Sequence, residues 1–170
     1  MHILIHKLWN RWRLSQYIMR GLQIADDCRL IEMPNFGSEP YLISIGRHVT
    51  ISARVNFINH DGGTWVFRDQ EKFRDVIKFG RIVIHDNCFI GAGATLLPGV
   101  TIGPNAVVAA QSVVAQSVPP NTVAGGIPAR VLMTIEDYAE KALEQTPHYD
   151  RTNYKRDKRA ELLRLFPRPW

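Results

Sequence analysis

A six-residue repeat constrains this chain more than any other feature of its sequence. The first place of each unit between residues 84 and 119 is aliphatic: Ile84, Ile90, Leu96, Ile102, Val108 and Val114. The fifth place is small or short: Cys88, Ala94, Val100, Ala106, Ser112 and Val118. An α-helix needs an apolar period near 3.6 and an isolated strand a period of 2, so neither explains the pattern. A fixed period of this kind is typical of a chain wound into stacked coils.

Each six-residue unit predicts one short strand and a corner, and three units predict one turn of a triangular coil. The aliphatic residue points inward and stacks on its equivalents in the next coils, about 4.8 Å away. The fifth residue also turns inward near a corner, where only a small group fits. Four residues are expected to supply tight corners that tolerate a positive φ: Gly91, Gly99, Gly103 and Asn105.

The repeat and the segment that follows it resemble the hexapeptide-repeat acyltransferases. The residues that carry the resemblance are 90–103 (IGAGATLLPGVTIG) and 118–132 (VPPNTVAGGIPARVL). They are similar to the galactoside and maltose O-acetyltransferases and to acetyltransferases of cell-surface polysaccharide synthesis, and the similarity spans about Phe36 to Leu132. The resemblance implies an all-β solenoid, the left-handed parallel β-helix, with acetyl-CoA as acyl donor. It also implies a homotrimer with active sites between subunits.

The chain divides into three predicted parts. Residues 1–23 read as a basic N-terminal helix, residues 24–132 as the β-helix domain, and residues 133–170 as a helical tail with helices at 135–145 and 155–165. The repeat is interrupted after Phe57, because the interval from Phe57 to the next clear unit at Ile84 is not a multiple of six. Residues 61–81 must therefore leave the coil as a protruding loop, and a loop of this length in a compact fold is usually functional.

Composition and charge narrow the classes of ligand and the location in the cell that we expect for this protein. The net charge is +5, with basic residues concentrated at both ends, which favours phosphorylated ligands over nucleic acid because a stacked coil offers no groove-reading element. No secretory signal or membrane-spanning run is evident, so the cytoplasm is expected. The N-terminal helix either caps the coil or makes peripheral contact with the inner face of the membrane. The two cysteines form no metal or disulfide framework.

His60 stands immediately before the loop. In the resembled family a histidine at this place is the catalytic base, and an imidazole is suited to take a hydroxyl proton near pH 7. Its neighbours Asn59 and Asp61 are candidate contacts to the acceptor substrate, with Asp61 alternatively a hinge residue. Trp65 could stack on a sugar face or pack within the loop.

The donor site is assigned by resemblance. Small residues at the coil edge let the amides of pantetheine approach the backbone, and the places expected to do so are Ala92, Ala109 and Ala110. Tight packing between coils explains the same residues equally well. Phe89 stands where relatives often have Trp, and Arg130 is expected to contact a phosphate of CoA or else to be a surface residue. A backbone N–H near Ala92 would steady the oxyanion.

These observations favour an acetyl-CoA-dependent O-acetyltransferase that acts on a sugar hydroxyl of a surface polysaccharide or its precursor, by direct transfer in a ternary complex. A nucleotide-sugar N-acetyltransferase shares the chemistry and stays open, as does a non-catalytic structural solenoid. A serine acetyltransferase is disfavoured because the large N-terminal helical domain of that family is missing. A γ-type carbonic anhydrase needs two histidines five residues apart, which the six histidines here do not provide, so no metal is expected.

Overall fold

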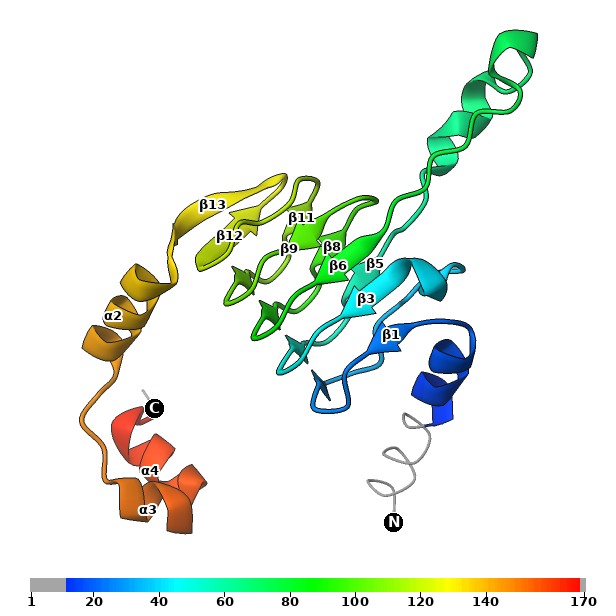
Figure 1. Cartoon of the computed structure of the whole chain (residues 1–170). Helices are drawn as coiled ribbons and strands as arrows, with labels where there is room; N and C mark the ends of the chain where they lie inside the picture. The colour runs from blue at the N-terminus through cyan, green and yellow to red at the C-terminus, as the bar shows by residue number, and fades with distance from the viewer. Residues whose placement is uncertain (1–11, 169–170) are drawn as a thin grey trace. The chain divides into compact units, whose positions relative to one another are not determined.

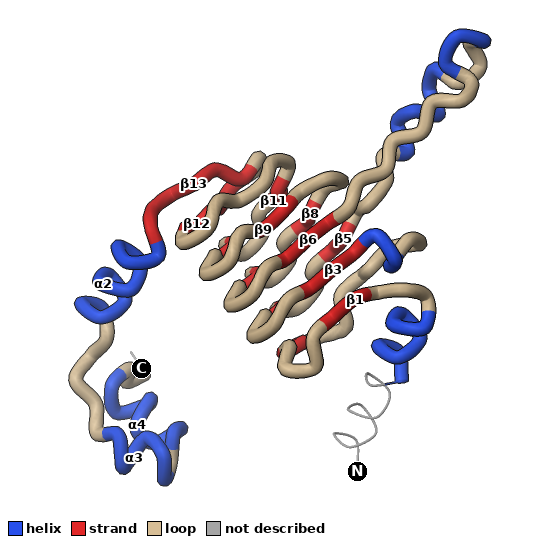
Figure 2. Tube along the Cα trace, in the orientation of Figure 1, coloured by secondary structure: helices blue, strands red, loops and turns tan. Residues whose placement is uncertain are grey.

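The computed structural model describes residues 12–168, which belong to two compact units, Met1–Ile135 and Glu136–Trp170. In the first unit, successive short strands pass from one sheet to the next, so that the chain winds around three faces (Figure 1, Figure 2). The first sheet has the order β1 (Gln23–Ile24), β3 (Ile43–Ile45), β6 (Ile82–Ile84) and β9 (Thr101–Ile102).

The second sheet has the order β13 (Ala129–Thr134), β12 (Thr122–Gly126), β10 (Val107–Val108), β7 (Phe89–Ile90), β4 (Thr50–Ile51) and β2 (Arg29–Leu30). The third sheet has the order β11 (Val113–Val114), β8 (Thr95–Leu96) and β5 (Asn56–Phe57). These pairings are parallel except the antiparallel pairing of β12 with β13. Val83 pairs with Thr101, which follows it by three six-residue units, as the repeat predicts for one turn of the coil.

The core confirms the inward-facing places of the repeat. The six aliphatic residues of the first place are 0–1% exposed, and the six residues of the fifth place are 0–5% exposed. At the N-terminal end of the stack, Phe36 packs against Phe57 with ring centroids 5.1 Å apart. Tyr17, from the helix at residues 12–19, meets the edge of Phe36. The helix expected over residues 1–23 ends earlier than predicted, because β1 begins at Gln23, and its part at residues 1–11 lies outside the described residues.

The corners correct one expectation. Gly99 and Asn105 have positive φ, at 85° and 55°, but Gly91 and Gly103 do not. A Cβ on Gly91 would instead collide with the backbone of Ala110 in the next coil. Gly91 and Gly103 are therefore required by the close approach of stacked coils and not by a left-handed backbone.

An arm, residues 61–81, leaves the coil between β5 and β6 (Figure 1). It contains two 3-10 turns, η2 (Gly62–Phe67) and η3 (Glu71–Phe73). Its neck is closed by backbone hydrogen bonds from the Asp61 amide to the Lys78 carbonyl, 2.8 Å, and from the Gly80 amide to the Asn59 carbonyl, 2.9 Å. The corner one coil earlier contains the short turn η1 (Pro40–Leu42).

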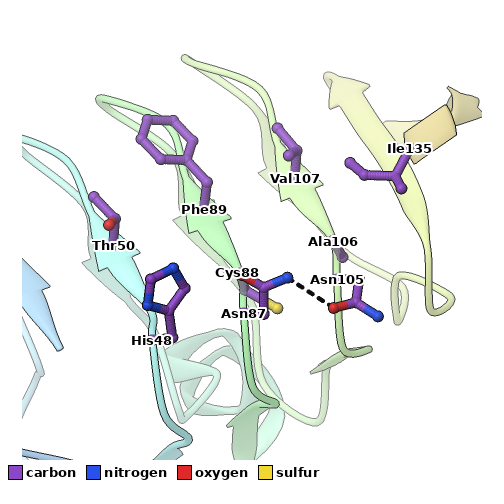
Figure 3. A pocket seen from close by; sticks show the side chains of 9 residues that line it. All are labelled: His48, Thr50, Asn87, Cys88, Phe89, Asn105, Ala106, Val107 and Ile135. Carbon is purple, nitrogen blue, oxygen red and sulfur yellow. Dashed lines mark hydrogen bonds between the residues drawn. The ribbon is translucent and has the colours of Figure 1, made fainter. Parts of the chain in front are cut away.

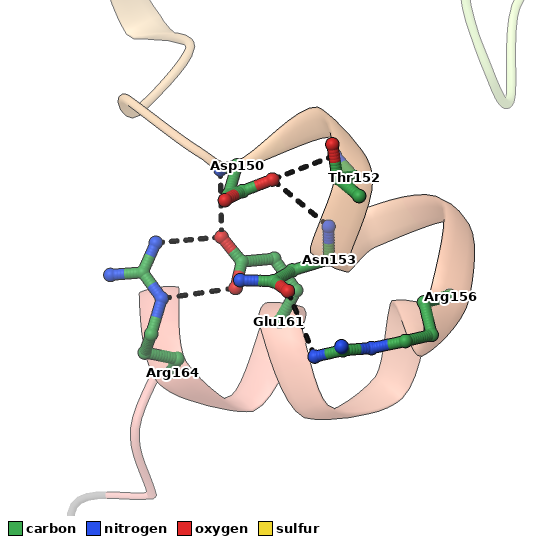
Figure 4. Close-up of polar contacts among 6 residues, drawn as sticks. All are labelled: Asp150, Thr152, Asn153, Arg156, Glu161 and Arg164. Atoms are coloured by element: carbon green, nitrogen blue, oxygen red, sulfur yellow. Dashed lines mark hydrogen bonds and ion pairs between the residues drawn. The ribbon is translucent and has the colours of Figure 1, made fainter.

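The second unit is helical. Helix α2 (Ile135–Gln145) has the bounds that the sequence predicts, but the helix expected at 155–165 is interrupted and forms α3 (Arg151–Arg156) and α4 (Lys158–Leu165). The break lies at Asp157, whose backbone is not helical and whose side chain caps α4 at the amide of Ala160. Figure 4 shows that Glu161 joins the two helices, because it accepts from the Asp150 amide and from Arg164.

No helix within residues 12–168 is both long enough and apolar enough to cross a membrane.

Candidate active site

A pocket of about 510 Å³ lies where the arm leaves the coil. The arm and its neck supply His60, Asp61, Gly62 and Lys78, and successive coils supply Ile58, Leu97, Pro98 and Ala115. A second pocket shares the first four residues and adds Thr64, Trp65, Arg68 and Phe79. The structure thus brings His60, Asp61 and Trp65 to one place. The side chain of Trp65 is not committed to packing within the arm, because the residue is 78% exposed.

The ring of His60 is held on two sides. Its Nδ1 lies 3.0 Å from Oε2 of Glu39, and its ring lies 5.7 Å from that of Phe79 between centroids. The His60 side chain is 45% exposed, whereas that of Glu39 is only 17% exposed. A carboxylate accepts hydrogen bonds, so the proton of the neutral ring belongs on Nδ1. The lone pair of Nε2 is then left for a proton from a substrate.

Asp61 is paired within the protein. Its Oδ2 lies 2.7 Å from Nζ of Lys78, and its Oδ1 accepts from the amide of Gly63 at 2.9 Å. The hydrogen bond from Lys78, followed by that from Gly63, lowers the pKa of Asp61 below its ordinary value. The carboxylate is therefore ionised and neutralised by a neighbouring cation near pH 7.

Asn59 departs from the expectation that it contacts the acceptor. It is 1% exposed, and its Nδ2 donates to the backbone carbonyl of Glu39 at 2.7 Å. Its Oδ1 is buried and has no hydrogen-bond partner within the described part of the chain. A side chain enclosed in this way holds the corner that contains Glu39, and it lines neither pocket beside His60.

The residues expected at the donor site lie elsewhere on the coil. Phe89 projects from β7 between Thr50 of β4 and Val107 of β10, over a separate pocket that also contains His48 and Asn105 (Figure 3). Ala92, Ala109 and Ala110 lie at the corner that joins the second sheet to the third. Arg130 is exposed on β13. One chain by itself does not bring any of them to the His60 pocket.

Sequence reasoning missed several residues around the pocket. Glu39 lies 21 residues before His60, and Lys78 lies 17 residues after Asp61, so only the folded chain pairs them. The residues Ile58, Leu97 and Ala115 each follow the inward-facing residue of a strand in the third sheet. This place holds Gly46, His85 and Gly103 at one other corner and Ser52, Gly91 and Ala109 at the third, so Ile58 and Leu97 were a readable apolar signal but Ala115 was not.

Comparison with known proteins identifies the family. Residues 81–116 match the sequence model described as bacterial transferase hexapeptide (six repeats). The chain is 47% identical to protein CapG of Staphylococcus aureus over 148 residues, which cover 86% of this chain and 84% of CapG. The chain belongs to the hexapeptide-repeat transferase family. Membership confirms the predicted family and the prediction that the protein is an enzyme.

Solved structures of the hexapeptide-repeat family agree with this assignment. The chain is 27% identical to the hexapeptide-repeat acetyltransferase VCA0836 of Vibrio cholerae, with a TM-score of 0.51 and coverage of 72% of this chain and 80% of that one. It is 31% identical to VCA0836 in complex with acetyl-coenzyme A, with a TM-score of 0.50. That match covers 67% of this chain and 60% of the other. Parallel sheets of short strands, wound around three faces, are the framework that this hexapeptide-repeat transferase provides for its site.

Proposed function

We propose that this protein is an acetyl-CoA-dependent O-acetyltransferase that acts on a sugar hydroxyl of a surface polysaccharide or its precursor. The observation that carries the proposal is the placement of His60, whose Nδ1 is occupied by Glu39 while its ring lines the pocket at the base of the arm. Family membership and the acetyl-coenzyme A complex of VCA0836 support acetyl-CoA as the donor.

His60 acts as the general base in direct transfer. Its Nε2 takes the proton of the acceptor hydroxyl as the hydroxyl oxygen bonds to the thioester carbonyl carbon. The resulting oxyanion is steadied by backbone N–H groups and then collapses, which breaks the C–S bond. The departing thiolate of CoA takes the proton from the His60 imidazolium. No covalent acetyl-enzyme forms, so neither cysteine takes part.

The electrostatics around His60 favour a hydroxyl acceptor over an amine. An ammonium group would need an uncommitted carboxylate near the base, to hold it before it loses its proton. The two carboxylates that lie beside the base among the described residues are already paired, Asp61 with Lys78 at 2.7 Å and Glu39 with His60 at 3.0 Å. A neutral sugar hydroxyl needs no such counter-charge, and the exposed Trp65 can stack on the sugar ring.

A homotrimer would complete the site. His60 lies at one corner of the coil, and the expected donor contacts Phe89, Ala92 and Arg130 lie on other surfaces. We infer that a neighbouring subunit supplies these contacts, with Ala109 and Ala110 lining the same groove. We also infer the left-handed winding of the resembled family for the catalytic coil in 24–132.

The test is release of thiol from acetyl-CoA with a panel of sugars, nucleotide sugars and amino sugars, near neutral pH. We expect acceptor-dependent release with hydroxyl acceptors, and a fall of roughly 10²–10⁴-fold in kcat for His60→Ala. The matched control is His148→Ala, which removes an exposed histidine of the second unit. Near-wild-type turnover in His60→Ala would refute the mechanism, and release only with amine acceptors would replace O-acetylation by N-acetylation.

A further inference from the structure

The first coil is longer at one corner than the regular coils that follow the arm. Gln23 pairs with Ser44 and Arg29 with Thr50, and each partner lies three residues beyond the three-unit spacing that separates Val83 from Thr101. The three additional residues fall after Phe36, because Leu30 and Phe36 keep the ordinary spacing of six. A coil that only needed to stack would not require this enlargement. The enlarged corner carries Glu39 and lies next to the corner where the arm departs.

The backbone around Glu39 is clamped by side chains from both neighbouring segments. Nη2 of Arg20 donates to the carbonyl of Ser38 at 2.7 Å, and Nδ2 of Asn59 donates to the carbonyl of Glu39 at 2.7 Å. The Gly37 amide is capped by the side chain of Asn35 at 3.1 Å. These contacts fix the corner from which the Glu39 side chain reaches His60.

The Glu39 carboxylate is largely withdrawn from water, at 17% exposure. Its Oε2 lies 2.9 Å from the hydroxyl of Ser38, which donates to it, and 3.0 Å from the Nδ1 of His60. Carboxylate oxygens accept hydrogen bonds, so the Nδ1 that faces Oε2 carries a proton in both the neutral and the charged form of the ring.

We propose that Glu39 is a positioning residue that fixes the tautomer and orientation of His60, and that Asn59 holds it in place through the Glu39 backbone. This inference rests on the proposed function. Glu39 keeps the proton on Nδ1, directs the Nε2 lone pair into the pocket and balances the charge that the ring gains in the transition state. Glu39 itself neither gains nor loses a proton during transfer.

The test combines kinetics with ¹⁵N spectroscopy of histidine-labelled protein. Glu39→Gln keeps a hydrogen-bond acceptor without the charge, and Glu39→Leu removes both. We expect kcat to fall about 10-fold in Glu39→Gln and about 100-fold in Glu39→Leu, the range that charge-assisted hydrogen bonds cover, with KM for both substrates nearly unchanged. The matched control Glu32→Gln alters an exposed carboxylate and should leave kcat unchanged.

The ¹⁵N measurement reports on the contact between Glu39 and His60 without any need for catalysis. In neutral wild-type protein the ¹⁵N shifts of His60 should report the Nδ1–H tautomer, and Glu39→Leu should convert it to a mixture. Wild-type kcat in Glu39→Leu, or an unchanged tautomer in that variant, would overturn the proposal. If His60→Ala retains turnover while Glu39→Leu changes the tautomer, the general-base mechanism fails but the positioning contact stands.

Discussion

Replacing Gly91 by alanine tests whether the spacing between coils dictates this part of the sequence. The Gly91 amide donates to the carbonyl of Val108 at 2.8 Å, so the residue lies directly against the next coil. A Cβ at Gly91 would overlap the backbone N of Ala110 and lie 2.6 Å from the carbonyl carbon of Ala109. Backbone atoms cannot rotate away, so the two coils must separate locally.

The expected loss of unfolding free energy in Gly91→Ala has two contributions. Inserting a methyl into a packed interior costs about 1–3 kcal/mol. Separating the coils also weakens the hydrogen bonds from Gly91 to Val108 and from Gln111 to Ala92, both 2.8 Å long, each worth roughly 1 kcal/mol net. We therefore expect Gly91→Ala to lower the free energy of unfolding by about 2–4 kcal/mol.

The matched control is Gly62→Ala in the arm. No atom lies within 4 Å of a Cβ at Gly62, and its φ is not in the left-handed region, so an alanine fits. We expect a change of at most about 1 kcal/mol, in the stabilising direction, because alanine restricts the unfolded chain. Urea unfolding followed by circular dichroism, at one fixed protein concentration, measures both variants. Equal stability of Gly91→Ala and Gly62→Ala would refute the close-approach argument.

Two further predictions concern charge. Lys78→Met should raise the pKa of Asp61 toward its ordinary value, which carboxyl ¹³C titration measures. It should also lower KM for amine acceptors, because the freed carboxylate can hold an ammonium group. Lys72→Met is the control for both measurements. The hydrogen bond from Arg164, followed by that from the Asp150 amide, lowers the pKa of Glu161 to about 2 (Figure 4). Because the folded pKa lies below the ordinary value of 4.5, this stabilisation is complete above that pH and is lost as pH falls toward 2. The Asp150 amide donates directly to Glu161, so its protection relative to the intrinsic exchange rate should fall over that window in the wild type, but not in Glu161→Gln.

Each of these two predictions about charge has a result that would contradict it. An unchanged Asp61 titration in Lys78→Met would show that the ion pair does not set the state of that carboxylate. Protection of the Asp150 amide that depends on pH equally in Glu161→Gln would assign the acid sensitivity of the second unit to another group.

The arm shows why the sequence predicted an insertion but not its contacts. The interval from Phe57 to Ile84 breaks the six-residue period, and the break points to His60 as the residue at the departure. The period says nothing about which residues close the neck. Pairing of Asp61 with Lys78, and the contact of the His60 ring with Phe79, depend on how residues 61–81 fold back.

The sequence by itself determined the stacked coils, because an aliphatic residue every six places can be buried only if each turn lies over the previous one. It also placed the candidate base. The tertiary structure alone decided what holds that base. Glu39 belongs to an enlarged coil that departs from the six-residue period, and it meets His60 only once the two coils are stacked. The sequence likewise predicted that Asn59 contacts the substrate, but the structure buries its side chain, which holds the Glu39 backbone instead. A local sequence cannot show which strand side chains are covered.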